Sequence, residues 1–296
     1  MLNFLPITLG RRGEIHPLLY GAGRQGCEYS FANLLFWMSA FSDYTTVGGF
    51  VCVRMKTKQG ERFLFPAGVG DPTAAIELLR RDAAERGVPF QMVGVTKNDR
   101  RLLEMFYPGR FLFTLLRDMF DYTYPVEQLA ELAGKKLQAK RNHINHFIAE
   151  HPDWRTEPIS EGNVELCRRC AQKWFLAHGE SDGEREHGIL ETALMNMQTL
   201  GMEGLLLLDG DEPLAFSLGN RITEKVFDVN FEKADADVHG SFAIINREMA
   251  RMVRSRYPEV TLLNREDDMG LPGLRKAKES YQPILLEKYS AVWEEK

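Results

Sequence analysis

A run of charged and amide side chains from Asn264 to Lys278 is the densest group of residues in this sequence that could do chemistry. It starts where a short apolar stretch ends, and α/β sheets bind ligands at the carboxyl ends of buried strands. Arg265 and Lys278 are cations that could stabilise the negative charge that develops on a carbonyl oxygen during acyl transfer. Pro272 suits the first turn of a helix, whose free backbone N–H groups can hold an anion. We therefore expect a reaction centre in this run.

Four further residues of the run complete this hypothesis. We expect Glu266 to bind the amine of a substrate or to accept its proton. Asn264, Asp268 and Arg275 are expected to bind substrate. Several charges in a row after a strand are also typical of a polar loop followed by a surface helix with ion pairs, and this alternative stays open.

A second group of carboxylates, Asp228, Glu232 and Asp237, alternates around a predicted strand at residues 225–231. An amine that attacks an activated ester has to lose a proton, and a carboxylate in the site can accept it. We assign this catalytic role to Asp228, with Glu266 as the alternative. The three carboxylates could instead solvate one side of the strand.

Two cations border the apolar face of a predicted helix at residues 126–150. The apolar side chains of this helix repeat at about 100° per residue, and Lys140 and Arg141 lie beside their stripe. Burying charge costs several kcal/mol unless a partner compensates it, so the pair could hold a phosphate or a carboxylate in a cleft. We expect Lys140, Arg141 and Asn142 to bind substrate. Alternatively, the two cations extend along the edge of the core to solvent, or pair with carboxylates.

Two pairs of possible metal ligands do not amount to a metal site. His143 and His146 have a suitable spacing, but no third ligand stands near them in the sequence. Cys167 and Cys170 share one face of a predicted helix, and free cysteines are commonly buried. We therefore predict no metal ion, and a packing role for the two cysteines.

The segment from Gly21 to Gly26 matches the glycine pattern of dinucleotide-binding loops. Such a loop must leave a buried strand and open a helix. The residues before it, 15–20, include a proline and make a poor strand. A loop without a bound nucleotide is therefore the expectation.

The chain has 296 residues, and its formal net charge is −5. At about 100 to 150 residues per domain, this length suggests two domains. The negative charge argues against a protein that coats nucleic acid through an overall positive field, so an anionic substrate has to meet a local basic patch. No apolar run reaches the roughly 20 residues that span a bilayer. The first residues also lack the pattern of a secretory signal, and we expect a cytoplasmic location.

The hydrophobic periods of the second half predict six strands and four helices. The strands are expected at 154–160, 204–209, 213–219, 225–231, 260–264 and 284–292, and the helices at 163–178, 184–200, 241–256 and 271–280. This order resembles that of a GNAT-like acyltransferase domain. The first half repeats part of it, with helices at 29–41, 72–86 and 98–106 and strands at 47–55, 62–66, 90–95 and 110–117.

The predicted fold is therefore α/β, with mixed sheets in two tandem GNAT-like acyltransferase domains. We expect a degenerate N-terminal domain at 1–125, a joining helix at 126–150 and a C-terminal domain at 151–296. In the C-terminal domain a CoA-dependent enzyme would need a glycine-rich pyrophosphate loop between the third strand and the next helix. Residues 232–241 at that place contain one glycine and three carboxylates, which disfavours CoA.

Two segments, 134–147 and 264–283, resemble the bacterial family related to the C-terminal synthase domain of phosphatidylglycerol lysyltransferase. The likeness covers nearly the whole chain, and it is greatest from Gly273 to Pro283, where Lys278 matches a lysine of the synthase active site. The resemblance implies tandem GNAT-like domains akin to the Fem-type peptidoglycan aminoacyltransferases, with aminoacyl-tRNA as donor. No segment of this sequence resembles the membrane-embedded half of the lysyltransferase, so we do not expect a lipid acceptor from the resemblance alone.

The resulting hypothesis is transfer of an aminoacyl or other acyl group from an activated carrier, with aminoacyl-tRNA as the expected partner, to an amine or hydroxyl of a small molecule or peptide. The ester is already activated, so positioning and charge stabilisation can carry the reaction. Two alternatives stay open. One is a CoA-dependent N-acetyltransferase, with acyl-CoA as cofactor, and the other is a non-catalytic module that binds a nucleotide, tRNA or peptide.

Overall fold

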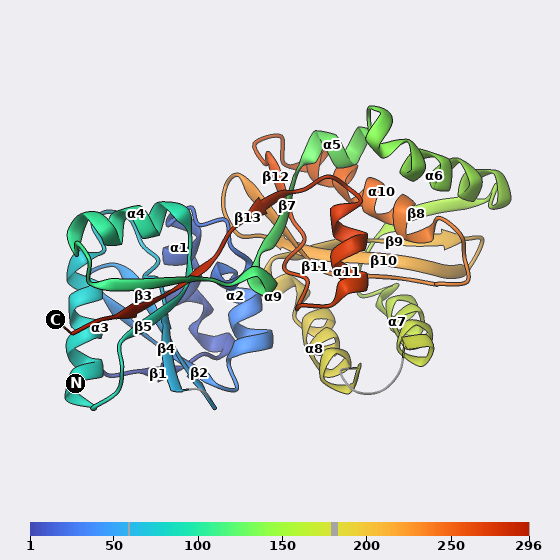
Figure 1. Cartoon of the computed structure of the whole chain (residues 1–296). Coiled ribbons are helices and arrows are strands. Elements are labelled where there is room, and N and C mark those ends of the chain that lie inside the picture. Colours follow the sequence, from blue (N-terminus) through green and yellow to red (C-terminus); the bar gives the residue numbers. More distant parts are fainter. Residues whose placement is uncertain (59, 179–182, 296) are drawn as a thin grey trace. The chain divides into compact units, whose positions relative to one another are not determined.

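The computed structural model describes residues 1–58, 60–178 and 183–295. The chain forms two compact units, which we describe separately (Figure 1). Unit 1 consists of Met1–Tyr122, Glu266–Arg275 and Leu285–Lys296, and unit 2 consists of Thr123–Arg265 and Lys276–Ile284. The polar run that follows the strand near residue 264 is therefore divided between the two units.

Unit 1 is built on a seven-stranded sheet in the order β1-β2-β3-β4-β5-β14-β6. Neighbours from β1 to β4 pair antiparallel, β4 and β5 pair parallel, and β14 runs antiparallel to β5 and β6. The strands are β1 Leu5–Pro6, β2 Ser42–Val47, β3 Phe50–Thr57, β4 Gly60–Leu64, β5 Gln91–Val95, β6 Phe111–Leu115 and β14 Tyr289–Trp293. The helices are α1 Arg12–Gly21, α2 Phe31–Asn33, α3 Thr73–Glu85 and α4 Lys97–Phe106.

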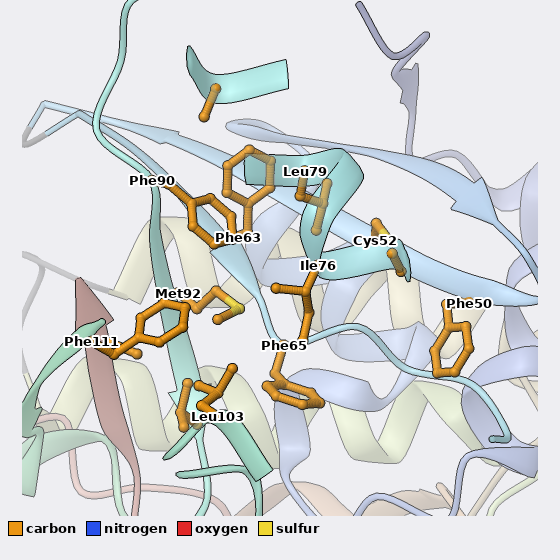
Figure 2. Packing of buried hydrophobic residues seen from close by; sticks show 14 residues of the cluster. Phe50, Cys52, Phe63, Phe65, Ile76, Leu79, Phe90, Met92, Leu103 and Phe111 are labelled. Atoms are coloured by element: carbon orange, nitrogen blue, oxygen red, sulfur yellow. The ribbon is translucent and has the colours of Figure 1, made fainter. Parts of the chain in front are cut away.

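An aromatic and aliphatic cluster forms the core of unit 1, where α3 packs on the sheet (Figure 2). Helix α3 places its apolar side chains on one face, which is the pattern of a helix that buries one side. From that face Ile76 and Leu79 enter the cluster, and Phe63 enters it from β4. The ring centres of Phe63 and Phe90 lie 5.6 Å apart. Each of these four side chains is at most 4% exposed.

We expect the substitution Phe63→Ala to lower the free energy of unfolding by about 3–5 kcal/mol, because it removes a large ring from a packed core and leaves a cavity. Urea denaturation followed by fluorescence measures this loss. Leu112→Ala on β6 is the matched control, since Leu112 is 55% exposed and surface changes usually stay within about 0.5 kcal/mol. Equal losses for the two variants would contradict the central place of Phe63.

The second sheet has the order β13-β7-β12-β11-β10-β9-β8. Strands β8 to β11 pair antiparallel, β11 and β12 pair parallel, and β12 pairs antiparallel with β7. The strands are β7 Asp121–Pro125, β8 Trp154–Pro158, β9 Met202–Asp209, β10 Glu212–Arg221, β11 Val226–Ala234, β12 Leu262–Asn264 and β13 Ile284–Leu286. The helices are α5 Val126–Glu131, α6 Gln138–Glu150, α7 Val164–His178, α8 Gly183–Met195, α9 Met197–Leu200, α10 Ser241–Arg256 and α11 Pro272–Glu279.

Both sheets contain the same succession of elements. In unit 1 the antiparallel strands β2, β3 and β4 lead through α3 to β5, which lies parallel to β4. In unit 2 the antiparallel strands β9, β10 and β11 lead through α10 to β12, which lies parallel to β11. The predicted α/β class with mixed sheets is therefore confirmed. Among the described residues, every helix is too short or too polar to cross a membrane.

The predicted last strand, 284–292, differs from the observed one. The segment forms two strands, β13 in the second sheet and β14 in the first sheet between β5 and β6. An apolar period predicts that a strand exists, but it carries no information on a partner strand far away in the sequence. The expectation of a single strand in the second half was therefore wrong.

The predicted helix at 126–150 is interrupted. Helix α5 ends at Glu131 and is followed by Leu132, which has a left-handed backbone with φ of 52°; Gly134 comes next but one, with φ of 84°. The guanidinium of Arg141 on α6 donates to the backbone carbonyls of both residues. A leucine rarely adopts this conformation, and Gly134 was the residue in the sequence that could have indicated the break.

Candidate functional site

The candidate site of unit 2 begins where two parallel strands part. The register of β11 and β12 ends at the pair Asp228 and Asn264. Strand β12 stops there, whereas β11 continues to Ala234. Side chains that follow the end of β12 therefore stand beside a stretch of β11 that is paired with β10 on its other side, at the kind of place where α/β proteins bind ligands.

Arg265, the first residue after β12, reaches across to β11. Its Nη2 donates to Oε1 of Glu232 at 2.7 Å, and the two side chains are 14% and 9% exposed. Its guanidinium carbon lies 5.2 Å from the ring centre of Tyr281 and 5.8 Å from that of Tyr124. Burial alone lowers the pKa of Arg265, but Glu232 outweighs this and raises it, so the group stays charged. Its buried Nη1 has no hydrogen-bond partner among the described residues.

Lys278 on α11 holds the backbone of this arginine. Its Nζ donates to the carbonyl oxygen of Arg265 at 2.6 Å, and Lys278 is 8% exposed. The hydroxyl of Tyr124 donates to the carbonyl oxygen of Lys278 at 2.8 Å. In this geometry Lys278 fixes where Arg265 stands, which is a positioning role beside the predicted catalytic one.

Lys140 borders a pocket of about 250 Å³ at the amino end of α10. The pocket is lined by Lys140, His143 and Tyr281 and by residues 236 and 238–243. The Nζ of Lys140 lies 4.0 Å from the ring centre of Tyr281. Burial, and then the charge of Arg265, lower the pKa of Lys140. A cation and the positive end of a helix dipole thus adjoin the same pocket, which favours an anionic ligand.

The neighbours of Lys140 on α6 have other contacts. The guanidinium of Arg141 closes the break before α6 and also contacts Gln138. Asn142 is exposed and accepts a hydrogen bond from Gln138 at 2.8 Å. Of the three residues predicted to bind substrate on this helix, Lys140 is the one that lines the pocket.

Asp228 and Asn264 are both fully buried, at 0% exposure. They face each other in the register of β11 and β12, and the amide of Asn230 donates to Oδ2 of Asp228 at 3.2 Å. The structure therefore brings together Asp228, Asn264, Arg265 and Lys278 at the end of the parallel ladder. Unit 2 also contains the three predicted substrate-binding residues of α6.

Glu266, Asp268 and Arg275 belong to unit 1. Glu266, with φ of 57°, accepts a hydrogen bond from the amide of Asn33 at 2.8 Å. Asp268 is fully buried and accepts from Nε of Arg275 at 2.7 Å and from the hydroxyl of Tyr122. Burial raises the pKa of Asp268, but these hydrogen bonds outweigh it and hold the pKa well below its usual range. The Asp268 and Arg275 pair thus orders the loop before α11.

Three members of the site were not predicted from the sequence. Glu232 was grouped with Asp228 and Asp237 as a possible proton acceptor or a solvating carboxylate, but its pairing with Arg265 was not predicted; it also accepts from the amide of Asn246 at 3.2 Å. Tyr124 and Tyr281 supply aromatic faces to the cations. A charged residue in an otherwise apolar strand was the available signal for Glu232, because a buried charge needs a partner.

Unit 1 contains a buried ionic cluster that no sequence motif indicated. Nζ of Lys288 donates to Glu28 and to Asp121, both at 2.6 Å, and lies 3.9 Å from Sγ of Cys27. Burial raises the pKa of Glu28. Burial and the charge of Asp121 raise the pKa of Cys27. Burial lowers the pKa of Lys288, but the surrounding acidic groups outweigh it and raise the pKa. The lysine therefore contacts both carboxylates within unit 1 and balances the charge of one of them.

The glycine segment is not preceded by a strand, and the cysteine pair is buried in the core. The glycine segment follows helix α1, which ends at Gly21, so no strand leads into it as a dinucleotide loop requires. Cys167 and Cys170 on α7 are both 0% exposed. Burial raises the pKa of each thiol to about 12, as expected for inert packed cysteines.

Comparison with known proteins decides the family. Residues 21–292 match the family described as phosphatidylglycerol lysyltransferase, C-terminal. The chain belongs to this family. The match includes both segments on which the resemblance rested, 134–147 and 264–283, and it confirms the predicted relationship.

Solved structures of similar proteins share the fold of this chain. A conserved protein of unknown function from Bacteroides thetaiotaomicron VPI-5482 is 36% identical, with a TM-score of 0.92 over 99% of this chain and 100% of that one. L-PGS from Bacillus licheniformis is 15% identical, with a TM-score of 0.65 over 96% and 92%. FemX is 9% identical, with a TM-score of 0.59 over 98% and 97%. The last two likenesses bear on the fold alone.

An uncharacterized protein from Mycoplasmoides gallisepticum is 25% identical over 175 residues, which is 57% of this chain and 54% of that protein. The match thus spans about half the length of this curated relative. Family and fold together confirm the predicted tandem GNAT-like architecture. The family supports an acyltransferase of the phosphatidylglycerol lysyltransferase type.

Proposed function

We propose that this chain transfers an aminoacyl group from aminoacyl-tRNA to an amine or hydroxyl acceptor. The observation that carries the proposal is the pocket of about 250 Å³ that Lys140 and the amino end of α10 border together. Arg265, which is buried beside Tyr281, adds a second cation within the same unit. Arg265 is already paired with Glu232, and Lys140 supplies positive charge at the pocket for an anionic donor.

The connection between β11 and α10 argues against CoA as the donor. A pyrophosphate loop needs backbone N–H groups that are open to the ligand. Here Gly240, with φ of 86°, packs so closely on α6 that a Cβ would lie 2.4 Å from the carbonyl oxygen of His143. The N–H of Ser241 donates to the carbonyl of Val238 at 3.2 Å. A donor held by a cation therefore fits this connection better than one held by a glycine-rich loop.

The proposed reaction needs no further activation of the donor. The acceptor nitrogen or oxygen attacks the ester carbonyl, the bond between that carbon and the ribose oxygen of the tRNA breaks, and the ribose hydroxyl leaves with a proton. Lys140 and Arg265 are suited to stabilise the oxyanion. Asp228 is the carboxylate that we assign to the proton that the acceptor loses.

Equilibrium binding separates this function from its rivals. We expect charged tRNA to bind at least about 10-fold more tightly than uncharged tRNA, since the aminoacyl end adds contacts worth about 1.4 kcal/mol or more, and acetyl-CoA to show no saturable binding. Fluorescence anisotropy with labelled tRNA and calorimetry with acetyl-CoA measure both. Acetyl-CoA binding as tight as that of charged tRNA would favour the N-acetyltransferase instead. Equal binding of charged and uncharged tRNA would favour a module that only binds tRNA.

A further inference from the structure

Strand β6 forms one outer edge of the sheet of unit 1, and among the residues that the structure describes no strand pairs with its outer side. The strand, Phe111–Leu115, consists of four apolar residues and one threonine, so it carries no charge and no proline. Exposed edges of this composition readily pair with another strand, and proteins usually protect them with charges, prolines or very short strands. Strand β6 lacks these protections.

The other outer strands of the two sheets are protected in these ways. Strand β1 has two residues and ends in Pro6, and β13 has three residues. Strand β8 contains Arg155 and Glu157, which form an ion pair at 2.9 Å, and it ends in Pro158. Of the outer strands in the described part of the chain, β6 is therefore the one best suited to accept a further strand.

The pairing of β6 with β14 determines which backbone groups face the free side. The N–H of Leu116 donates to the carbonyl of Lys288 at 2.9 Å, and the N–H of Glu294 donates to the carbonyl of Arg110 at 2.8 Å. Residues that point the same way alternate along an antiparallel strand, and this register is continuous along β6. The even-numbered residues therefore point toward β14. Three residues turn their N–H and C=O groups to the free side: Phe111, Phe113 and Leu115.

Exposed apolar side chains lie at this edge. Leu112 and Leu115 of β6 are 55% and 50% exposed. Helix α4 contacts β6 and ends in Met105 and Phe106, which are also exposed. Several exposed apolar side chains on neighbouring elements are typical of an interaction surface. The edge thus offers a partner apolar contacts as well as backbone hydrogen bonds.

A second copy of β6 that runs antiparallel matches this edge. When Phe113 lies opposite Phe113 of the second copy, Phe111 lies opposite Leu115. All three outward residues then form hydrogen-bonded pairs, and each pair exchanges two N–H···O bonds. Leu112 lies opposite Thr114 of the second copy at the closer spacing of a non-hydrogen-bonded pair, where the side chains contact each other. One strand therefore supplies both sides of the interface.

The charges that flank β6 fit the same register. Arg110 comes directly before the strand, and Arg117 is the second residue after it. With the two copies centred on Phe113, Arg110 lies opposite Leu116, and Arg117 lies opposite Gly109. No cation faces another cation, an arrangement that would destabilise the pair. A second copy is thus a partner whose sequence, register and charges this edge accommodates.

We propose that two copies of this chain form a dimer in which their β6 strands pair antiparallel around Phe113. The contact is isologous, since the same patch serves on both copies, and it joins two seven-stranded sheets into one continuous sheet. An interface of one strand per copy is small, so the dimer is weak and exchanges with the monomer. The dimer does not depend on the proposed aminoacyl transfer.

Sedimentation equilibrium of the full-length protein tests the dimer between about 1 and 200 µM, the range of weak specific association. We expect monomers at the lowest concentration and dimers at the highest. Leu115→Pro, which removes an N–H of the free side without removing a bond to β14, should raise the dissociation constant at least about 10-fold. Leu112→Lys should do the same by adding a charge to the edge. Protein that stays monomeric over the whole range would overturn the proposal.

Leu176→Lys is the matched control for Leu112→Lys. It makes the same change at an 81% exposed position of α7, and it should dimerise as the parent does. Equal weakening by the two lysine variants would contradict the role of β6. A dimer that Leu115→Pro leaves unchanged would contradict it as well, because the contact would then lie elsewhere.

Cysteine cross-linking tests the register. Phe113→Cys places two thiols opposite each other, with Cα atoms about 5.5 Å apart, a separation that a disulfide spans. Leu115→Cys places its two thiols four residues apart along the strands, about 13 Å, which a disulfide cannot span. Oxidation in air with a copper catalyst should link the first variant and not the second, and the parent gives the background from its own free cysteines. Equal linkage of both variants, or none in Phe113→Cys while the parent dimerises, would exclude the proposed register.

Discussion

The substitution Lys140→Met is expected to lower the rate of aminoacyl transfer about 10²-fold, the effect of losing one charge-stabilising donor in an active site. The ammonium of Lys140 lies 4.0 Å from the ring centre of Tyr281. Methionine removes this charge but keeps an apolar side chain against the ring. The free energy of unfolding should therefore change by less than about 1 kcal/mol. Single-turnover transfer from labelled aminoacyl-tRNA measures the rate, and urea denaturation measures the stability.

Lys136→Met is the control for this prediction. Lys136 is exposed and precedes α6, so the variant removes the same charge from the same region without touching the pocket. It should transfer at the rate of the parent. Equal losses in the two variants would mean that only the general positive charge of the region attracts tRNA. Full activity of Lys140→Met would remove Lys140 from the reaction.

Arg265→Met is expected to destabilise unit 2 by about 3–5 kcal/mol, because it leaves the carboxylate of Glu232 buried without its partner. The ion pair is 2.7 Å long, and the two side chains are only 14% and 9% exposed. Transfer should be lost together with stability. Urea denaturation and the transfer assay at a temperature where the variant is folded give the two results.

The double variant Arg265→Met/Glu232→Met separates the two effects. Replacing both members of a buried ion pair by apolar side chains is often neutral or stabilising, so most of the lost stability should return. Activity should not return, since the cation beside the two tyrosines is still absent. A double variant as unstable as Arg265→Met alone would show that the pair does not account for the loss. Recovery of activity would show that Arg265 serves only the fold.

Local patterns in the sequence predicted the elements that are built from contiguous residues. Helix α10 has the bounds that its apolar period predicts, 241–256. Pro272 stands at the first position of α11, as its fixed φ suggested. The end of β12 was predicted to carry functional side chains, and Asn264 and Arg265 do stand there beside Asp228.

The contacts between distant residues could not be predicted in the same way. Glu232 and Arg265 are 33 residues apart, and Lys288 lies 260 residues from Glu28. Hydrophobic periodicity predicts helices and strands from neighbouring residues, but it does not indicate which distant charged residues pair with each other. The left-handed backbone at Leu132 is a further case, since tertiary contacts such as that of Arg141 hold a conformation that leucine rarely adopts.

The most direct test of aminoacyl transfer follows the label on tRNA. Purified protein is incubated with tRNA charged separately with each labelled amino acid, together with an extract of small molecules, peptides and lipids as acceptors. We predict that for at least one amino acid the label leaves tRNA faster than by spontaneous hydrolysis and enters a stable product, and that Lys140→Met slows this about 10²-fold. Label that stays on tRNA for every amino acid, while the same preparation transfers acetyl groups from acetyl-CoA, would contradict the proposed function.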